Sequence, residues 1–270
     1  MKRLLVVLVA ACCTLVTSIA MAQSVVLDRI KKAGVIRVGT KTDYRPFGFL
    51  DPSGKIVGME PDLAQDLAKR LGVKLELMPV QTANRIEFLQ QGRIDLMIAT
   101  MSVNDQRRKI VGVIEPFYFA GGTSLLVRKS AGIKRWEDIR GKDICGTQGA
   151  YYNRPVTEKY GANIVAFPGS TEAQNALLNG SCVGFLQDST LHAAMLASGD
   201  PQWAAFDAPL PVEDYQPWAI AVPIEELNTA YGNFARQAVT AWHTSGLLIE
   251  LEKKWGLKPS DFLKDTRTKL

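Results

Sequence analysis

The sequence predicts an α/β fold of two lobes, each built on a mainly parallel sheet with flanking helices. Strand-like and helix-like segments alternate along the chain, which is the pattern of parallel strands covered by helices. The same rhythm starts again near residue 125, and two extended segments, 125–127 and 219–222, connect the two units. Two units joined by two extended crossings indicate a hinged pair of lobes with a cleft between them.

The first unit contains three strand-like and two helix-like segments. Its best-marked helix begins near Pro61, because proline suits a first turn, leucines then recur every four residues, and Gly72 follows as a stop. Gly92 ends a second, shorter helix. The elements predicted in this unit are strands over 35–40, 73–77 and 94–99 and helices over 61–71 and 83–91.

The second unit repeats this order. Gly149 is expected to open one helix, and Asn179-Gly180 stops the next. The predicted elements are strands over 143–145, 164–167 and 182–186, a helix from 149 and a helix over 171–178. After the second crossing, Pro223 precedes a long amphipathic helix over 227–245 and a shorter one over 247–255.

The first 22 residues have the three parts of a secretory signal peptide. Lys2 and Arg3 give a positive start, residues 4–16 are almost wholly apolar, and Ala20-Met21-Ala22 forms a small-residue cleavage site. An alternative is lipoprotein cleavage before Cys12, within Val9-Ala10-Ala11-Cys12, which would leave a lipid anchor on that cysteine. No later segment is long and apolar enough to predict a membrane span.

The charge pattern argues against nucleic acid as a partner. The formal net charge is +5, and the basic residues are scattered and interleaved with acids instead of forming a stripe. We expect no metal and no cofactor, because the two cysteines and two histidines outside the leader show no ligand spacing. These four residues are Cys145, Cys182, His192 and His243.

Cys145 and Cys182 are the only cysteines left after cleavage, and both lie in predicted strands. Export to an oxidising compartment favours a disulfide between them. A bridge closing a loop of this size contributes about 3–4 kcal/mol in the chain-entropy model. Two buried free thiols are the alternative.

The segment 95–118 carries the clearest chemical pattern. An apolar run ends in two hydroxyls, Thr100 and Ser102, and Arg107 follows one short turn later. The planar guanidinium fork donates two parallel hydrogen bonds to a carboxylate, and hydroxyls with free N–H groups at a helix start complete such a cradle. The pattern predicts a clamp for a small carboxylate. Taken alone, it also fits a buried strand, turn residues and a solvated basic helix.

The chain resembles the periplasmic amino-acid-binding proteins of ABC importers, the family-3 solute-binding proteins, and is closest in pattern to glutamate/aspartate-type members. Five pieces in family order carry the resemblance: VIRVGTKTDYRPFGF, GMEPDLAQDLAKRLG, QGRIDLMIATMSVNDQRRKIVGVIEPFY, GKDICGTQGAYYN and GSCVGFLQDS. The resemblance implies the type II periplasmic-binding-protein fold, with lobe 1 formed by 23–124 and 220–270 and lobe 2 by 125–219. It also implies a periplasmic monomer that delivers its ligand to ABC permease subunits.

The resemblance assigns roles to residues on both lobes. Arg107, helped by Thr100 and Ser102, would bind the ligand α-carboxylate, and Asp188 would bind the α-ammonium from lobe 2. Tyr44 would cover the ligand with its ring. The turn Gly149-Ala150 would donate backbone N–H groups to the carboxylate, although Ala150 stands where the family commonly has a hydroxyl. Helix capping remains the alternative for Asp188, and core packing for Tyr44.

Two basic residues bear on specificity. The resemblance implies that Lys41 and Arg85, the latter within Thr82-Ala83-Asn84-Arg85-Ile86, face the side-chain carboxylate of an acidic ligand. Two cations there disfavour lysine, arginine or histidine by like-charge repulsion. Both could instead be surface charges.

Two rival functions share this fold. Some relatives are periplasmic dehydratases of cyclic amino-acid precursors, for which Glu60 or Glu115 would be the candidate acid or base. Neither lies in a recognisable catalytic constellation, and no nucleophile elbow, zinc motif or phosphate loop is present, so we expect a protein that is not an enzyme. A binding protein that reports to a membrane sensor would use the same residues as a transport protein.

Overall fold

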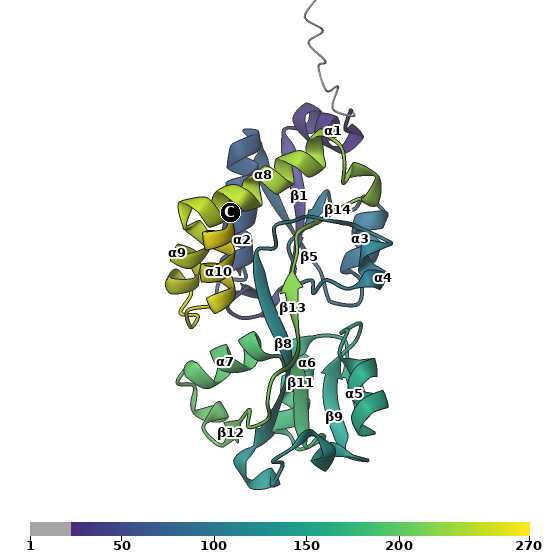
Figure 1. Cartoon of the computed structure of the whole chain (residues 1–270), viewed down its shortest axis with the longest axis vertical. Coiled ribbons are helices and arrows are strands. Elements are labelled where there is room, and N and C mark those ends of the chain that lie inside the picture. Colours follow the sequence, from purple (N-terminus) through teal and green to yellow (C-terminus); the bar gives the residue numbers. More distant parts are fainter. Residues whose placement is uncertain (1–22) are drawn as a thin grey trace, which may run out of the picture.

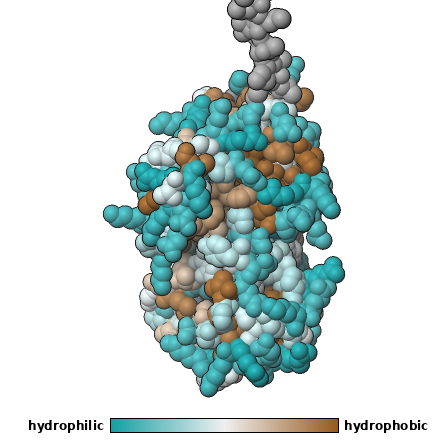
Figure 2. All heavy atoms as spheres, in the orientation of Figure 1, coloured by the Kyte–Doolittle hydropathy of each residue, from teal (hydrophilic) through white to brown (hydrophobic). Residues whose placement is uncertain are grey.

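The computed structural model describes residues 23–270, so the expected signal peptide and Cys12 lie outside the described residues. Within this range the chain forms two lobes, each with its own sheet, connected by the strands β8 and β13 (Figure 1). No helix in residues 23–270 has both the length and the apolarity to cross a membrane. Figure 2 shows hydrophilic residues over most of the visible face of both lobes, with apolar residues in scattered groups.

Lobe 1 is built on a five-stranded sheet in the order β5-β1-β6-β14-β7. A short hairpin sheet, β2-β3-β4, lies beside it. The strands of this lobe are β1 (Val35–Thr40), β2 (Asp43–Tyr44), β3 (Gly48–Leu50), β4 (Ile56–Val57), β5 (Lys74–Pro79), β6 (Leu96–Met97), β7 (Gly112–Val113) and β14 (Ala221–Val222). Its helices are α1 (Val25–Ala33), α2 (Met59–Leu71), α3 (Arg85–Gln90), α4 (Asp105–Arg108), the 3-10 helix η4 (Ile224–Glu226), α8 (Ala230–Ser245), α9 (Leu247–Lys254) and α10 (Asp261–Lys269).

Lobe 2 is built on a six-stranded sheet in the order β10-β9-β11-β8-β12, with β13 also paired to β8. Its strands are β8 (Phe119–Arg128), β9 (Asp143–Thr147), β10 (Asn163–Phe167), β11 (Gly184–Asp188), β12 (Phe206–Asp207) and β13 (Glu213–Trp218). Its helices are α5 (Asn153–Tyr160), α6 (Ser170–Leu178), α7 (Ser189–Ala197) and the 3-10 helices η1 (Lys129–Ala131), η2 (Trp136–Ile139) and η3 (Pro201–Trp203).

Both sheets are mixed, with one reversed strand each among the described residues. β14 runs antiparallel to β6 and β7, and β8 runs antiparallel to β11, β12 and β13. The reversed strands are those that follow or precede a crossing between the lobes. The residue position 124/125, expected as a lobe boundary, lies inside β8, which is one continuous strand paired to Trp218 and Gln216 of β13.

Three local expectations differ from the structure. Gly149 does not open a helix: it has φ +77°, a left-handed turn conformation, and α5 begins only at Asn153. The long C-terminal helix begins at Ala230, because residues 224–226 form a separate 3-10 helix and the Thr229 side chain caps the next turn. Only Leu96 and Met97 pair as a strand within 94–99, although the whole run is buried.

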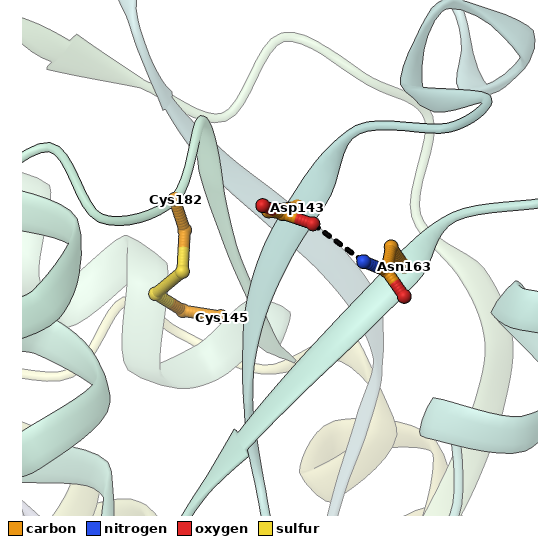
Figure 3. Close-up of a disulfide and its surroundings, with 4 residues drawn as sticks. All are labelled: Asp143, Cys145, Asn163 and Cys182. Atoms are coloured by element: carbon orange, nitrogen blue, oxygen red, sulfur yellow. Dashed lines mark hydrogen bonds between the residues drawn. A yellow bond between two sulfur atoms is a disulfide. The ribbon is translucent and has the colours of Figure 1, made fainter.

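The cysteines of the described chain, Cys145 and Cys182, are joined by a disulfide with their Cα atoms 5.5 Å apart (Figure 3). It ties β9 to the loop that leads into β11, the strand that ends at Asp188. Beside it, the Asn163 amide donates to Asp143 Oδ1 at 2.6 Å across the neighbouring strand pair. The disulfide therefore stiffens the part of lobe 2 that carries one candidate ligand-binding carboxylate.

Candidate functional site

A cavity lies between the two lobes where the expected binding residues meet. Its volume is about 10 Å³, roughly the space of one water molecule, so the lobes touch one another here. Lobe 1 and lobe 2 both contribute to its lining, which consists of Tyr44, Thr82, Arg85, Thr100, Ser102 and Arg107 from lobe 1 and Ala150, Tyr151, Tyr152, Gln187 and Asp188 from lobe 2. The structure thus represents a closed arrangement of the lobes.

Hydrogen bonds to two residues just before it in the chain, Ser102 and Asn104, hold Arg107 in the cavity. Its N–H donates to the side chain of Asn104, the N-cap of α4, at 2.9 Å, and Nη1 donates to the Ser102 carbonyl at 2.8 Å. Nη2 donates across the cleft to the Gly149 carbonyl at 3.2 Å. Burial, reinforced by the nearby Arg85, lowers the pKa of Arg107 to about 9. A cation this poorly solvated gains strongly from an anionic partner.

Arg85 starts α3 and is buried beneath the same cavity. Its Nη1 donates to the carbonyls of Ala99 and Thr100, whereas Nε has no hydrogen-bond partner within residues 23–270. Burial lowers the pKa of this guanidinium as well. The lining therefore contains two poorly solvated guanidinium groups, those of Arg85 and Arg107, and the Nε of Arg85 has no acceptor within residues 23–270.

Thr100 and Ser102 lie at the carboxyl end of the buried run, as expected. Thr100 has φ +48°, a left-handed conformation uncommon for a β-branched residue. Its N–H is fixed by Glu60 Oε1 at 2.7 Å and by the Tyr118 hydroxyl at 3.1 Å. Burial raises the pKa of Glu60 to about 7. A strained backbone supported by buried polar partners is typical of a functional site.

Asp188 closes the cavity from lobe 2. It occupies the N-cap position of α7, but its side chain makes no capping hydrogen bond. Instead, Oδ2 accepts the Tyr44 hydroxyl of lobe 1 at 2.6 Å, and Oδ1 has no hydrogen-bond partner within the described chain. Burial raises the pKa of Asp188 to about 6. Asp188 is the one carboxylate in the described cavity lining.

Lys41 is not in the cavity lining, contrary to the expectation that it faces the ligand. It is completely buried, with Nζ 3.0 Å from Asp43 Oδ1 and 3.1 Å from Thr82 Oγ1. Asp43 in turn accepts the Ser170 N–H at the start of α6 on lobe 2, at 2.6 Å. A local acid thus neutralises Lys41, and the pair ties the two lobes together beside the cavity.

The turn Gly149-Ala150 lies at the cavity, but the Ala150 N–H is not the free donor that was expected. The Ala150 N–H donates to the Thr147 carbonyl at 3.1 Å, because the turn closes on itself, and the Gly149 carbonyl accepts from Arg107. A Cβ at Gly149 would lie 2.9 Å from Ala83 Cα, so glycine permits this close contact between the lobes.

Four lining residues were not anticipated: Thr82, Tyr151, Tyr152 and Gln187. The rings of Tyr151 and Tyr152 meet edge to face with centroids 4.9 Å apart, and Gln187 Nε2 donates to Thr147 Oγ1 at 3.2 Å. Position in the sequence was the available signal, because the tyrosines directly follow the turn and Gln187 directly precedes Asp188. Within residues 23–270 no group of acidic, histidine or cysteine side chains is arranged to hold a metal ion.

The family model of bacterial extracellular solute-binding proteins, family 3, matches residues 36–258. The chain belongs to this family. Its fold is that of the type II periplasmic binding proteins: a mutant of ArgBP from T. maritima superposes with a TM-score of 0.79 at 29% identity, covering 85% of this chain and 98% of that one.

Relatives with different functions match at comparable identity. The glutamine-binding protein of Geobacillus stearothermophilus is 34% identical, over 70% of this chain and 74% of the relative. The L-glutamate/L-aspartate-binding protein of Pseudomonas aeruginosa is 27% identical, over 86% and 80%. The cyclohexadienyl dehydratase of the same species is also 27% identical, over 91% of both chains. Family membership is therefore clear, and the ligand has to be inferred from the site.

Proposed function

We propose that this protein captures a polar, acidic L-amino acid between its lobes and delivers it to an ABC transporter permease. The observation that carries the proposal is the placement of Arg107 on lobe 1 and Asp188 on lobe 2 in one cavity lining. A zwitterion matches this pair, with its carboxylate on Arg107, Thr100 and Ser102 and its ammonium on the unpaired Asp188 Oδ1. Tyr44, which already bonds Asp188, covers the ligand.

The acidic side chain follows from the charges that remain. With the α-carboxylate on Arg107 and the ammonium on Asp188, Arg85 stays in the lining without an acidic partner of its own there. Its free Nε is suited to a ligand side-chain carboxylate. Lys41 acts indirectly in this proposal, by fixing the Thr82 hydroxyl at the cavity wall. A cationic side chain would face Arg85 and be repelled.

In this mechanism, ligand binding is coupled to closure of the two lobes. The ligand docks on lobe 1 in an open form and gains Asp188 and the turn at Gly149-Ala150 only when lobe 2 arrives. Such differential contact shifts the population toward the closed form. In the closed form Arg107 itself reaches the Gly149 carbonyl of lobe 2, so the carboxylate-binding residue also senses closure.

A dehydratase is the second candidate, because one relative is named as such. The two acids that the sequence offered for this chemistry lie away from the cavity lining: Glu60 is buried behind Thr100, and Glu115 is on the surface beside Arg108. A general acid must reach the substrate. This placement favours a binding protein, and a sensor-linked binding protein would use the same cavity residues.

We further infer an exported, periplasmic monomer. The leader-like residues 1–22 and the disulfide between Cys145 and Cys182 support export to an oxidising compartment, with lipid anchoring at Cys12 as the alternative. In this proposal lobe 1 comprises residues 23–124 and 220–270, and lobe 2 comprises 125–219.

The direct test is calorimetric titration of the mature chain, freed of bound ligand by unfolding and refolding. Glutamate, aspartate, glutamine and arginine are added separately at neutral pH. Binding of an acidic amino acid with arginine silent supports the proposal. Tight binding of arginine refutes the specificity, and turnover of a cyclic amino-acid precursor by the same sample favours the enzyme.

A further inference from the structure

The helix α6 of lobe 2 has glycine at its N-cap, Gly169, which has no side chain to cap the first turn. The first backbone N–H groups of a helix have no partner inside the helix, and a Ser, Thr, Asp or Asn at the N-cap ordinarily accepts from one of them. Here the first helical residue, Ser170, is completely buried. A buried N–H needs a partner, so the cap of α6 has to come from another part of the chain.

That partner is Asp43, on the strand β2 of lobe 1. Its Oδ2 accepts the Ser170 N–H at 2.6 Å across the boundary between the lobes. A carboxylate at this position also complements the positive end of the helix dipole. Asp43 therefore caps a helix of the other lobe, and this contact, which we call the interlobe cap, forms only when lobe 2 lies against lobe 1.

The missing side chain at Gly169 gives Asp43 access to α6. A Cβ built on Gly169 would lie 2.7 Å from Asp43 Oδ2, closer than atoms that are not bonded approach one another. It would also lie 2.5 Å from Glu172 Oε2, but Glu172 is exposed and its side chain can turn away. Gly169 has φ −133°, which any residue adopts, so its backbone does not require glycine. The close approach of Asp43 accounts for the glycine.

Asp43 is held from its own lobe by Lys41. Lys41 Nζ lies 3.0 Å from Asp43 Oδ1, so one carboxylate oxygen faces each lobe. Lys41 is completely buried, and burial lowers its pKa, whereas the Asp43 carboxylate favours the charged ammonium. The ion pair thus fixes the carboxylate that caps α6.

These contacts continue to the amino-acid cavity on both sides. In lobe 1, Lys41 Nζ lies 3.1 Å from Thr82 Oγ1. In lobe 2, Gln187 Nε2 donates to Ser170 Oγ at 3.4 Å. Thr82 and Gln187 line the cavity, whereas Asp43 does not. The interlobe cap therefore connects the two walls of the cavity without contacting its contents.

We propose that Asp43 is a positioning residue for closure, which stabilises the closed form by capping α6 across the lobe boundary. The inference rests on the proposed function, in which the lobes close on an amino acid. A contact present only in the closed form shifts the population toward that form. Because Asp43 does not contact the amino acid, it should raise the affinity for every bound amino acid by the same factor.

The test compares Lys41→Met with Lys41→Met/Asp43→Ala by calorimetric titration with glutamate, aspartate, glutamine and arginine. The Lys41→Met background removes the buried cation, so the loss of Asp43 does not leave that cation unpaired. Loss of the cap should lower affinity about 3- to 30-fold, by one factor for each amino acid that Lys41→Met binds. Equal affinities of the two variants would overturn the interlobe cap, and a loss confined to one amino acid would overturn its independence from the ligand.

Gly169→Ala tests the cap from lobe 2 and keeps the test decisive if the Lys41 variants do not fold. Its Cβ should displace Asp43 from the Ser170 N–H and weaken binding by a similar factor, but cost nothing further in Asp43→Ala, where the clash is gone. An equal loss in both backgrounds would place the effect within α6 and overturn the cap. Asp51→Ala, which removes a carboxylate that accepts from Ser53 and Lys55 in its own turn, is the control and should bind like the parent.

Small-angle X-ray scattering separates failure of the cap from failure of the proposed function, because it needs no amino acid. If the parent binds none of the four amino acids, the proposed function fails and the radius of gyration decides on the cap. The ligand-free Lys41→Met chain should then be more compact than ligand-free Lys41→Met/Asp43→Ala. Equal radii of gyration would overturn the interlobe cap.

Discussion

The hydroxyl of Tyr44 on lobe 1 donates a 2.6 Å hydrogen bond to Asp188 Oδ2 on lobe 2. This bond uses one carboxylate oxygen and leaves Oδ1 without a partner among the described residues. The same contact thus closes the cleft and orients the group proposed to bind the ligand ammonium. Since both partners are buried, water does not compete with the bond.

Tyr44→Phe removes this hydroxyl and keeps the ring. A hydrogen bond to a charged group is worth about 1.5–3 kcal/mol, so amino-acid affinity should fall about 10- to 100-fold by calorimetry. Tyr160→Phe is the matched control, because its hydroxyl bonds Glu213 within lobe 2. Unchanged affinity in a folded Tyr44→Phe variant would show that the contact does not support binding.

Arg85→Gln should remove the preference for acidic ligands. Glutamine keeps a donor for the Ala99 and Thr100 carbonyls but loses the positive charge. We expect the affinity for glutamate or aspartate to fall by roughly 2 kcal/mol or more, with little change for glutamine. Arg93→Gln, an exposed position near the end of α3, is the control. If Arg85→Gln lowered the affinity for acidic and neutral ligands equally, Arg85 would not determine the preference for acidic ligands.

Binding should weaken as pH falls through about 6. Burial in the closed arrangement raises the pKa of Asp188 to about 6, so below that value closure of the lobes favours the protonated carboxyl, which has no charge to attract an ammonium. The dissociation constant should then rise up to about tenfold for each pH unit. Glu60, whose pKa is raised to about 7, also titrates nearby, so Asp188→Asn is needed as the comparison. A pH profile that Asp188→Asn leaves unchanged would assign the effect elsewhere.

Replacing both cysteines by alanine should destabilise the folded chain. The cross-link closes a loop with a sequence separation of 37 and contributes about 3–4 kcal/mol through the entropy of the unfolded chain. The free energy of unfolding in urea, measured for Cys145→Ala/Cys182→Ala beside the parent, tests this. The parent in reductant should approach the variant, and identical unfolding curves with and without reductant would contradict the estimate.

The sequence located much of the fold because helix stops and strand alternation are local signals. Gly72 ends α2 in a left-handed conformation, and α6 ends at Leu178, directly before Asn179-Gly180, as predicted. The start of α5 was misplaced for the related reason that a glycine also serves turns: Gly149 lies in one. The mixed direction of the sheets depends on how the chain crosses between lobes, which periodicity does not encode.

The residues of the cavity were predictable only in part. The residue pattern of 95–118 predicted a clamp with Arg107, whereas the roles of Asp188 and Tyr44 came from the resemblance to the family; all three line the cavity. The pairing of Lys41 with Asp43 was missed, because it depends on the path of the hairpin that carries Asp43. The sequence also could not predict that Arg85 Nε and Asp188 Oδ1 lack hydrogen-bond partners among the described residues, because this depends on all the contacts around them.

The most direct test of the clamp is calorimetric titration of Arg107→Ala and Asp188→Ala with the amino acid that the parent binds. Leaving one buried charge of the ligand unpaired should cost about 2–5 kcal/mol, a loss of roughly thirtyfold or more. The neighbouring Arg108→Ala, which loses an exposed pair with Glu115 and a contact with the Phe117 ring, should bind like the parent. Folded Arg107→Ala and Asp188→Ala variants that bind as tightly as the parent would contradict the proposed site.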